Sequence, residues 1–446
     1  MRILLAALLT SFVSAQTTWV VDDNPGPGVA FTSLPAAVAA AASGDTLLVA
    51  PGHYEPFHVS GKALTILGDG NVTTFIDGSP IAGTNDYVNI TAPPVGTTFR
   101  LSGVTIRRDV FTGSASLPPN RLGISGAGVS TAGTVVLTDV LSEPTPFGAQ
   151  YGGGLEIGLG VTNIAVSASR CVFRGGWLVS PFVPQTRGFP GANVGGGLFV
   201  ADACLIHGAS PSPIGGAQSI TAGDGLSVIS PHRVHLTGCS VSGGSTPSGI
   251  GGAGLRAYNP TVRVYGSAAN SIRGGNGGPG SAGPGIDAVG GTVSVFGAVA
   301  VSGGTSPSGP APATTGTGQV QLGLPPRPLL SLTGSAPTGG DLQATQPVNL
   351  RIDAPTVASQ LFILFVDLAP GNFALPGLST EPFLLTASAA ILSVGLLDAG
   401  GQFAVTLVPA TEAPVLVNHT FHLQAFAFDP ALGIWLGSNA EVRRIR

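Results

Sequence analysis

The chain has 446 residues, of which 43% are hydrophobic and only 9% are charged, and its formal net charge is −4. This balance gives no case for a nucleic-acid-binding protein, and it is the reverse of the polar, highly charged composition of a disordered chain. The 68 glycines indicate a fold with many tight corners.

The N-terminal segment combines a basic start at Arg2, a short apolar run and small residues before Gln16. This pattern is typical of a cleaved signal peptide, which we place over residues 1–15. The apolar run is too short to span a membrane, and no later stretch suits a transmembrane helix. We therefore expect a protein that is secreted or held at the cell surface.

Residues 31–78 predict an end cap followed by short strands. Ser33 is a suitable N-cap for a helix over residues 34–42, and Gly44 is suited to stop that helix. A small amphipathic helix of this kind would cover the open end of a stack of strands. Strands are predicted over residues 46–50, 63–67 and 74–78.

Two runs in this stretch carry a family resemblance. Gly44-Asp-Thr-Leu-Leu-Val-Ala-Pro-Gly-His-Tyr54 and Leu64-Thr-Ile-Leu-Gly-Asp-Gly70 closely resemble the opening of right-handed parallel β-helix proteins of the pectin-lyase-like superfamily. The resemblance implies an all-β, right-handed parallel β-helix solenoid with an N-terminal capping helix. The superfamily includes polysaccharide lyases, glycoside hydrolases and non-enzymes, so the resemblance does not choose an activity.

A six-residue phrase recurs through the middle of the chain with a near-constant period. Its copies begin at Cys171, Cys204, Cys239, Asn270 and Val299, which are 33, 35, 31 and 29 residues apart. A period of this size indicates a solenoid. Strand alternation places the first residue of each copy inward, as a core ladder, and the fourth residue outward.

The inward cysteines leave two alternatives open. Three is an odd number, so either all are reduced core residues, or one strained disulfide leaves a free thiol. A zinc site is not expected, because no second Cys or His lies at ligand spacing. We expect no metal and no cofactor, except that Asp22-Asp23 could bind calcium or form a polar turn.

These patterns divide the chain into four parts. After the signal peptide we place a parallel β-helix domain over residues 16–304, a Pro/Gly-rich linker over 305–328 and a second domain over 329–446. Separate strands with turn signals make the second domain a small antiparallel β-sandwich. The ending from His422 to Ala440 is similar to a C-terminal module of exported proteins from planctomycete-type bacteria.

The acidic residues give little sign of catalysis. Hydrolysis of a glycan needs paired carboxylates, and calcium-dependent elimination needs clustered acids with a base. The acids of the predicted solenoid are scattered singly, at Asp109, Asp139, Glu143, Glu156, Asp202, Asp224 and Asp287. We interpret them as solvated or turn-forming residues.

The outward column carries the candidate binding site. Arg174, His207 and Arg273 share one register, and His235 and Arg263 are predicted to point outward from a neighbouring strand. A flat basic ribbon of this kind could engage an acidic glycan, because arginine forks match carboxylates. The alternative is an ordinary solvated face on which a few charges happen to align.

The leading hypothesis is an exported, non-enzymatic surface or matrix protein that contacts a polysaccharide or another cell-envelope component. A divergent polysaccharide lyase or glycoside hydrolase of the pectin-lyase-like superfamily is the alternative. In a third hypothesis, the C-terminal module attaches or sorts the protein and the β-helix is a spacer. The sequence does not define the oligomeric state.

Overall fold

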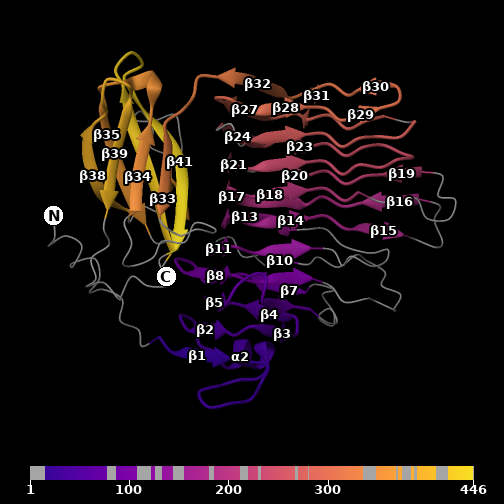
Figure 1. Cartoon of the computed structure of the whole chain (residues 1–446), viewed down its shortest axis with the longest axis vertical. Coiled ribbons are helices and arrows are strands. Elements are labelled where there is room, and N and C mark those ends of the chain that lie inside the picture. Colours follow the sequence, from indigo (N-terminus) through magenta and orange to yellow (C-terminus); the bar gives the residue numbers. More distant parts are fainter. Residues whose placement is uncertain are drawn as a thin grey trace.

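A computed structural model describes the chain in segments and confirms the predicted fold class. A parallel β-solenoid with one helix near its start is followed by a small antiparallel domain, which lies beside it (Figure 1). The described residues are 16–77, 87–107, 122–125, 133–143, 155–179, 185–210, 219–229, 233–266, 270–279, 281–334, 348–367, 370–373, 383–385, 389–407 and 420–444. The predicted signal peptide and Asp109 lie outside them.

Three parallel sheets enclose the solenoid core, because successive coils add strands to the same three faces. Sheet 1 contains β1 (Thr18–Val21), β2 (Thr46–Val49), β5 (Thr65–Gly68), β8 (Thr98–Ser102), β11 (Thr134–Thr138), the C-terminal halves of β13 (Leu155–Ser169) and β17 (Ala192–Asp202), then β21 (Arg233–Thr237), β24 (Thr261–Tyr265), β27 (Thr292–Phe296) and β32 (Gln319–Leu324). Sheet 2 contains β3 (Gly52–Tyr54), β6 (Thr74–Ile76), β9 (Thr105–Arg107), β12 (Leu141–Glu143), β14 (Val172–Arg174), β18 (Leu205–His207), β22 (Ser240–Ser242), β25 (Ser271–Arg273) and β28 (Ala300–Ser302). Sheet 3 contains β4 (Phe57–Ser60), β7 (Val88–Thr91), β10 (Leu122–Ser125), the N-terminal halves of β13 and β17, then β20 (Leu226–Ile229), β23 (Leu255–Tyr258), β26 (Ile286–Val289) and β31 (Thr314–Gly316).

The repeated phrase marks the corner between sheets 1 and 2. A residue with positive φ turns the chain there, for example Arg170 at 53°, Ala203 at 51° and Gly238 at 62°. The next residue in each of these coils is a cysteine, which points into the core. The following strand then alternates inward and outward, so that Phe173 and Ile206 are fully buried.

The N-terminal cap forms as predicted but is shorter. Helix α2 (Leu34–Ala40) starts at Ser33, whose hydroxyl accepts a hydrogen bond from the Ala36 amide, and buries Leu34 and Val38. It ends two residues earlier than predicted, at a C-cap on Ala41 rather than near Gly44. The ammonium group of Lys62 satisfies carbonyl groups at the C-terminal end of the helix. Its Nζ donates to the carbonyl oxygens of Val38, Ala39 and Ala41 at 3.2, 2.9 and 2.9 Å.

Beyond sheets 2 and 3 the coils extend as a thin double layer, which we call the glycine fin. Its outermost strands are β15 (Trp177–Val179), β16 (Gln185–Gly188), β19 (Ser219–Thr221), β29 (Thr305–Ser306) and β30 (Gly309–Pro310). Backbone amides zigzag between the two layers at 2.8–3.0 Å, from Phe189 to Gly176, Ala209 to Phe189, Gly223 to Ala209, Gly244 to Gly223, Gly252 to Gly244, Gly275 to Gly252, Gly283 to Gly275, Gly304 to Gly283 and Ala311 to Gly304. Glycine is required because a Cβ at Gly244 would overlap the carbonyl oxygen of Ala209.

The segment predicted as a linker is largely part of the solenoid. β31 pairs in parallel with β26, and β32 pairs in parallel with β27, so the last coil runs to Leu324. Only residues 325–328 connect it to the second domain. The Pro/Gly-rich composition that suggested a semi-rigid linker reflects the tight corners of this coil and the tip of the fin.

The C-terminal domain is a β-sandwich that packs on the outer face of sheet 1. Its core joins both antiparallel sheets, with Leu350 and Phe362 fully buried. One sheet contains β33 (Leu329–Gly334), β34 (Val348–Asp353) and β39 (Gln402–Leu407), and the other contains β38 (Ala390–Leu396), β35 (Leu361–Asp367), β40 (Thr420–Asp429) and β41 (Ile434–Arg444). A two-stranded ribbon of β36 (Pro370–Phe373) and β37 (Phe383–Leu385) and the short 3₁₀ helix η1 (Pro355–Val357) complete the domain. β36 contacts β13, and β41 contacts β17.

Within the described segments, no helix has the length and apolar character needed to cross a membrane.

Candidate functional site

The outward face of sheet 2 carries one continuous polar column. Strand register aligns Arg107 with Glu143, and it aligns Arg174 with His207. It then aligns His207 with Ser242, and Ser242 with Arg273. The predicted members Arg174, His207 and Arg273 therefore lie on one face, with Arg174 one coil and Arg273 two coils from His207.

These three residues also line a groove where sheet 2 meets the glycine fin. The groove has a volume of about 540 Å³. Its lining residues are Arg174, Gly175, His207, Gly208, Ser210, Ser242, Gly243, Ser245, Arg273, Gly274 and Asn276. The side chains that line this groove are therefore basic, hydroxyl or amide groups, and no acid is among them.

Side chains bond successive coils along the fin wall of the groove. The Ser210 hydroxyl accepts from the Ser245 amide, and the Ser245 hydroxyl accepts from the Asn276 amide, both at 2.9 Å. Asn276 Oδ1 then accepts from the amide of Thr305 at 2.9 Å. This ladder fixes the positions of the polar atoms that face the groove.

The positive charge of the groove is uneven. Arg174 forms an ion pair with Glu143 at 3.0 Å, so a carboxylate already offsets its charge. Burial, and to a lesser degree the charge of Arg174, lowers the pKa of His207, and its Nδ1 lies 2.5 Å from the Ser242 hydroxyl. Arg273 is exposed and forms no ion pair within the described part of the chain, so it is the strongest anchor for an anion.

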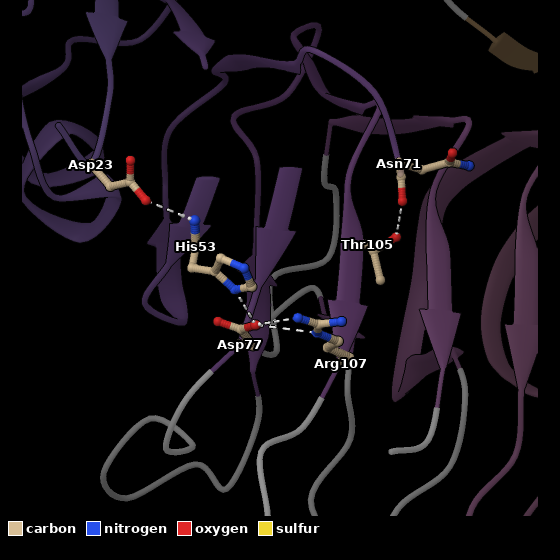
Figure 2. A network of polar contacts seen from close by, with 6 residues as sticks. All are labelled: Asp23, His53, Asn71, Asp77, Thr105 and Arg107. Carbon is tan, nitrogen blue, oxygen red and sulfur yellow. Dashed lines mark hydrogen bonds and ion pairs between the residues drawn. The ribbon is translucent and has the colours of Figure 1, made fainter. Parts of the chain in front are cut away.

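The N-terminal end of the column is a self-contained network rather than an open ribbon (Figure 2). Asp77 accepts from Arg107 Nε at 3.2 Å and lies 2.8 Å from His53 Nδ1. The ring of Phe75 stacks on His53 at 5.0 Å, and the Arg107 guanidinium lies 4.1 Å from the same ring. Asp23 accepts from the His53 amide at 3.0 Å, so the network ties the first coils together.

His235 and Arg263 do not belong to this face, and His235 does not point to solvent. Both lie on sheet 1, where register pairs them. His235 is only 3% exposed, and its ring stacks on Tyr265 with centroids 5.9 Å apart. Its outward neighbour Val200 is buried as well, because the C-terminal domain packs against this sheet. Alternation correctly separates inward from outward positions, but it does not show which outward face a second domain covers.

The first four positions of the predicted core ladder are buried, and its last member, Val299, is half-buried. Cys171, Cys204 and Cys239 are free thiols, and Asn270 continues their column with 1% exposure. Burial, with the neighbouring thiols of Cys171 and Cys239, raises the pKa of Cys204. Thiols held in this way are shielded from reagents and act as small core residues.

One acid–arginine–acid cluster forms on sheet 3 that sequence spacing did not reveal. Arg256 lies 3.3 Å from both Asp224 and Asp287. Burial opposes its charge, but Asp224, Tyr258 and Asp287 together raise the pKa of Arg256. Its guanidinium is therefore held as a cation, unsuited to act as a general base. The side chain of Glu156 lies outside the described part of the structure.

The possible calcium ligands Asp22 and Asp23 both accept hydrogen bonds from Asn24, and Asp23 also accepts from the His53 amide. Asp22 accepts from the Asn24 amide at 2.9 Å, and Asp23 accepts from the Asn24 side chain at 2.7 Å. Among the described residues, no group of three or more His, Cys, Asp or Glu side chains is arranged to hold a metal ion.

Two acids of the outward column were not predicted to lie there, because they belong to coils without the cysteine phrase: Glu143 was interpreted as a solvated or turn-forming residue, and Asp77 was not singled out. A sequence signal for Glu143 was present, since Val140-Leu-Ser-Glu143 aligns with Cys171-Val-Phe-Arg174.

The fold and this groove define a parallel β-helix protein with a polar, arginine-bearing flank. No known family model, curated protein or solved structure matches the chain.

Proposed function

We propose that this protein is exported and acts, without catalysis, as a surface or matrix protein that contacts acidic polysaccharide through the groove on sheet 2. The observation that carries the proposal is the alignment of Arg174, His207 and Arg273 along one polar groove. A linear glycan suits a site that repeats from coil to coil, because its own groups repeat along its length. Hydroxyl and amide side chains suit its hydroxyls, and the arginines suit its carboxylates.

Export is proposed from the leader-like pattern of residues 1–15, and the opening's resemblance to the pectin-lyase-like superfamily supports a role in glycan contact. The similarity of the ending to a planctomycete-type module supports a location at the cell envelope. Fractionation of the source cells tests this location, and recovery of the protein in the cytoplasm alone would contradict it.

The groove is tested by affinity electrophoresis in gels that contain an acidic or a neutral polysaccharide. Arg273→Ser should weaken retention by roughly tenfold, because it removes a charged donor that has no acid partner among the described residues. Arg174→Ser should have a smaller effect, because Glu143 already offsets that charge. Arg351→Ser is the matched control, since Arg351 is exposed, lies in the C-terminal domain and pairs with Asp353.

Retention should also fall with added salt, as expected for exposed charges. Equal retention of Arg273→Ser and Arg351→Ser would contradict the proposal that the groove binds a glycan. Retention that is the same on neutral and acidic gels would show that the arginines do not recognise the ligand.

A divergent polysaccharide lyase or glycoside hydrolase is the second candidate. The cluster of Arg256 between Asp224 and Asp287 is the observation that favours it, because acids and an arginine converge there. The same polysaccharides, assayed for unsaturated products and for new reducing ends, distinguish the candidates. Product formation that Asp287→Asn abolishes would support the enzyme, and binding without products would support the matrix protein.

A further inference from the structure

The two ends of the solenoid are finished in different ways. At the N-terminal end, helix α2 lies against β1, β2 and β4 and buries Leu34, Ala37 and Val38. At the C-terminal end, β28, β31 and β32 close sheets 2, 3 and 1, and each pairs with a strand on one side only. Figure 1 shows these strands at the end of the stack, and no described helix or strand continues the three sheets beyond them.

Within the described part of the chain, the core is correspondingly less well buried at this end. Val301 follows Ile272 in the same inward column, yet Ile272 is 1% exposed and Val301 is only half-buried. Val320 follows Val293 in the same way, and it too is half-buried while Val293 is fully buried. One further coil would complete the burial of both valines.

The shape of this surface restricts what can cover it. Its strand edges lie on three sides of one core, and a partner must offer matching edges at the spacing of about 4.8 Å between paired strands. The C-terminal end of a second copy has this outline. The N-terminal end of a second copy does not, because α2 closes it, so head-to-tail stacking is blocked.

The charge of the last coil also permits a two-fold contact. Residues 300–326 contain no Asp, Glu, Lys or Arg. A two-fold axis brings two copies of the same surface together, so a charge-free coil places no like charges in the contact. Solitary sheet edges are usually protected by lysine or proline, but the prolines of this coil lie outside β28, β31 and β32.

We propose that two copies of this chain associate tail to tail through the last coil of the solenoid. The winding of the second copy runs in the opposite sense when both are viewed along one axis. The strands β28, β31 and β32 of one protomer therefore meet those of its partner in antiparallel orientation, and Val301 and Val320 become buried. The inference is independent of the proposed glycan contact.

Light scattering on the full chain across a dilution series tests the association, and small-angle X-ray scattering tests its geometry. We expect a mass that rises to twice that of the chain and a maximum dimension that grows along the solenoid axis. Val301→Glu should raise the dissociation constant by roughly tenfold or more, because it places an unpaired carboxylate in the contact. Val72→Glu is the matched control, since Val72 is 78% exposed and lies near the opposite end.

Gln319→Glu replaces Val301→Glu as the test if the latter does not fold, because Gln319 is exposed on the edge strand β32. It should also weaken the association of the two copies. A chain that stays monomeric at every concentration would overturn the proposal. So would a dimer whose maximum dimension barely exceeds that of the monomer, or a dimer that the folded edge variant does not weaken.

Discussion

Burial sets the protonation state of two histidines, His235 in the solenoid and His422 in the C-terminal domain. Desolvation, reinforced by nearby arginines, lowers the pKa of each from 6.5 to about 3. Both rings are neutral in the folded protein at neutral pH, whereas in the unfolded chain they take up a proton near 6.5. The unfolded state therefore binds more protons below that pH, and stability conferred by the neutral rings is lost as pH falls from 6.5 towards 3.

We predict that each of these histidines removes about 1.4 kcal/mol of unfolding free energy per pH unit below 6.5. Below pH 6.5, the His235→Phe variant should lose about 1.4 kcal/mol less unfolding free energy per pH unit than the parent protein, because phenylalanine cannot take up a proton. Urea unfolding at a series of pH values measures the slope. Tyr265→Phe is the control, since it removes the hydroxyl 3.3 Å from His235 Nδ1 and keeps the imidazole. Parallel pH profiles for His235→Phe and the parent protein would contradict the prediction.

At the scale of single elements, the cap helix α2 depends on side chains from the coils that it covers. Asp45 accepts from the amides of Thr17 and Ala42 and from the indole of Trp19. Burial raises the pKa of Asp45, but these hydrogen bonds and Lys62 outweigh it, so the net shift is downward. Lys62, the only lysine in the chain, closes the C-terminal end of the helix.

Lys62→Met should destabilise the cap by about 1–2 kcal/mol, because carbonyls at the helix C-terminus lose a charged donor. Hydrogen exchange over residues 34–40 should speed up, while exchange in sheet 2 should stay unchanged. Arg351→Met, which removes a charge from the other domain, should leave α2 as protected as before. Unchanged exchange in α2 of Lys62→Met would show that the lysine does not hold the cap.

The glycine fin depends on the absence of side chains between its layers. We predict that Gly244→Ala costs about 1–3 kcal/mol of unfolding free energy, because the methyl group must displace the backbone at Ala209. Gly26→Ala is the control, since nothing lies within 4 Å of a Cβ placed there. Chemical unfolding of both variants measures the difference. Equal midpoints would mean that the layers can separate without cost.

The repeated elements were the part of the fold that could be predicted from sequence. Alternation and period placed Cys171 and Phe173 inward and Arg174 outward, since these positions follow from local strand geometry. The extra coil after residue 304 was not predicted, because its sequence is rich in Gly, Pro, Ser and Thr and carries no copy of the phrase. The groove partners Ser210 and Asn276 lie on the fin, whose folding depends on contacts between coils rather than on local pattern.

At the scale of the whole molecule, the C-terminal domain decides which outward surface remains free. Sheet 1 has apolar outward residues, Val136 and Val200, which are 1% and 4% exposed. Apolar residues at outward positions indicate a face that another part of the chain covers, but the sequence analysis did not predict that sheet 1 is covered. Sheet 2 has Arg174 and Arg273 at outward positions and stays open. The division between the flank that the C-terminal domain covers and the flank that stays open is therefore encoded in the outward columns.

The contact between the domains contains a charged pair. Asp367 and His422 are cross-strand neighbours in the sandwich, and both interact with Arg100 of sheet 1. Burial lowers the pKa of Arg100 to about 10, and Asp367 opposes this shift. Arg100 Nη1 is shielded from solvent. The carboxylate therefore supports a guanidinium that would otherwise be poorly solvated.

We expect Asp367→Asn to weaken docking of the two domains by on the order of 2 kcal/mol, because it leaves the Arg100 charge partly buried without its carboxylate. Arg100→Met combined with Asp367→Asn should recover much of this loss, since a neutral pair needs no solvation. Calorimetry should show one transition for the parent protein and two for Asp367→Asn, with faster hydrogen exchange along β41 and β17. If the double variant is as weakly docked as Asp367→Asn, then the loss comes from packing, and the charged pair does not hold the sandwich against the solenoid.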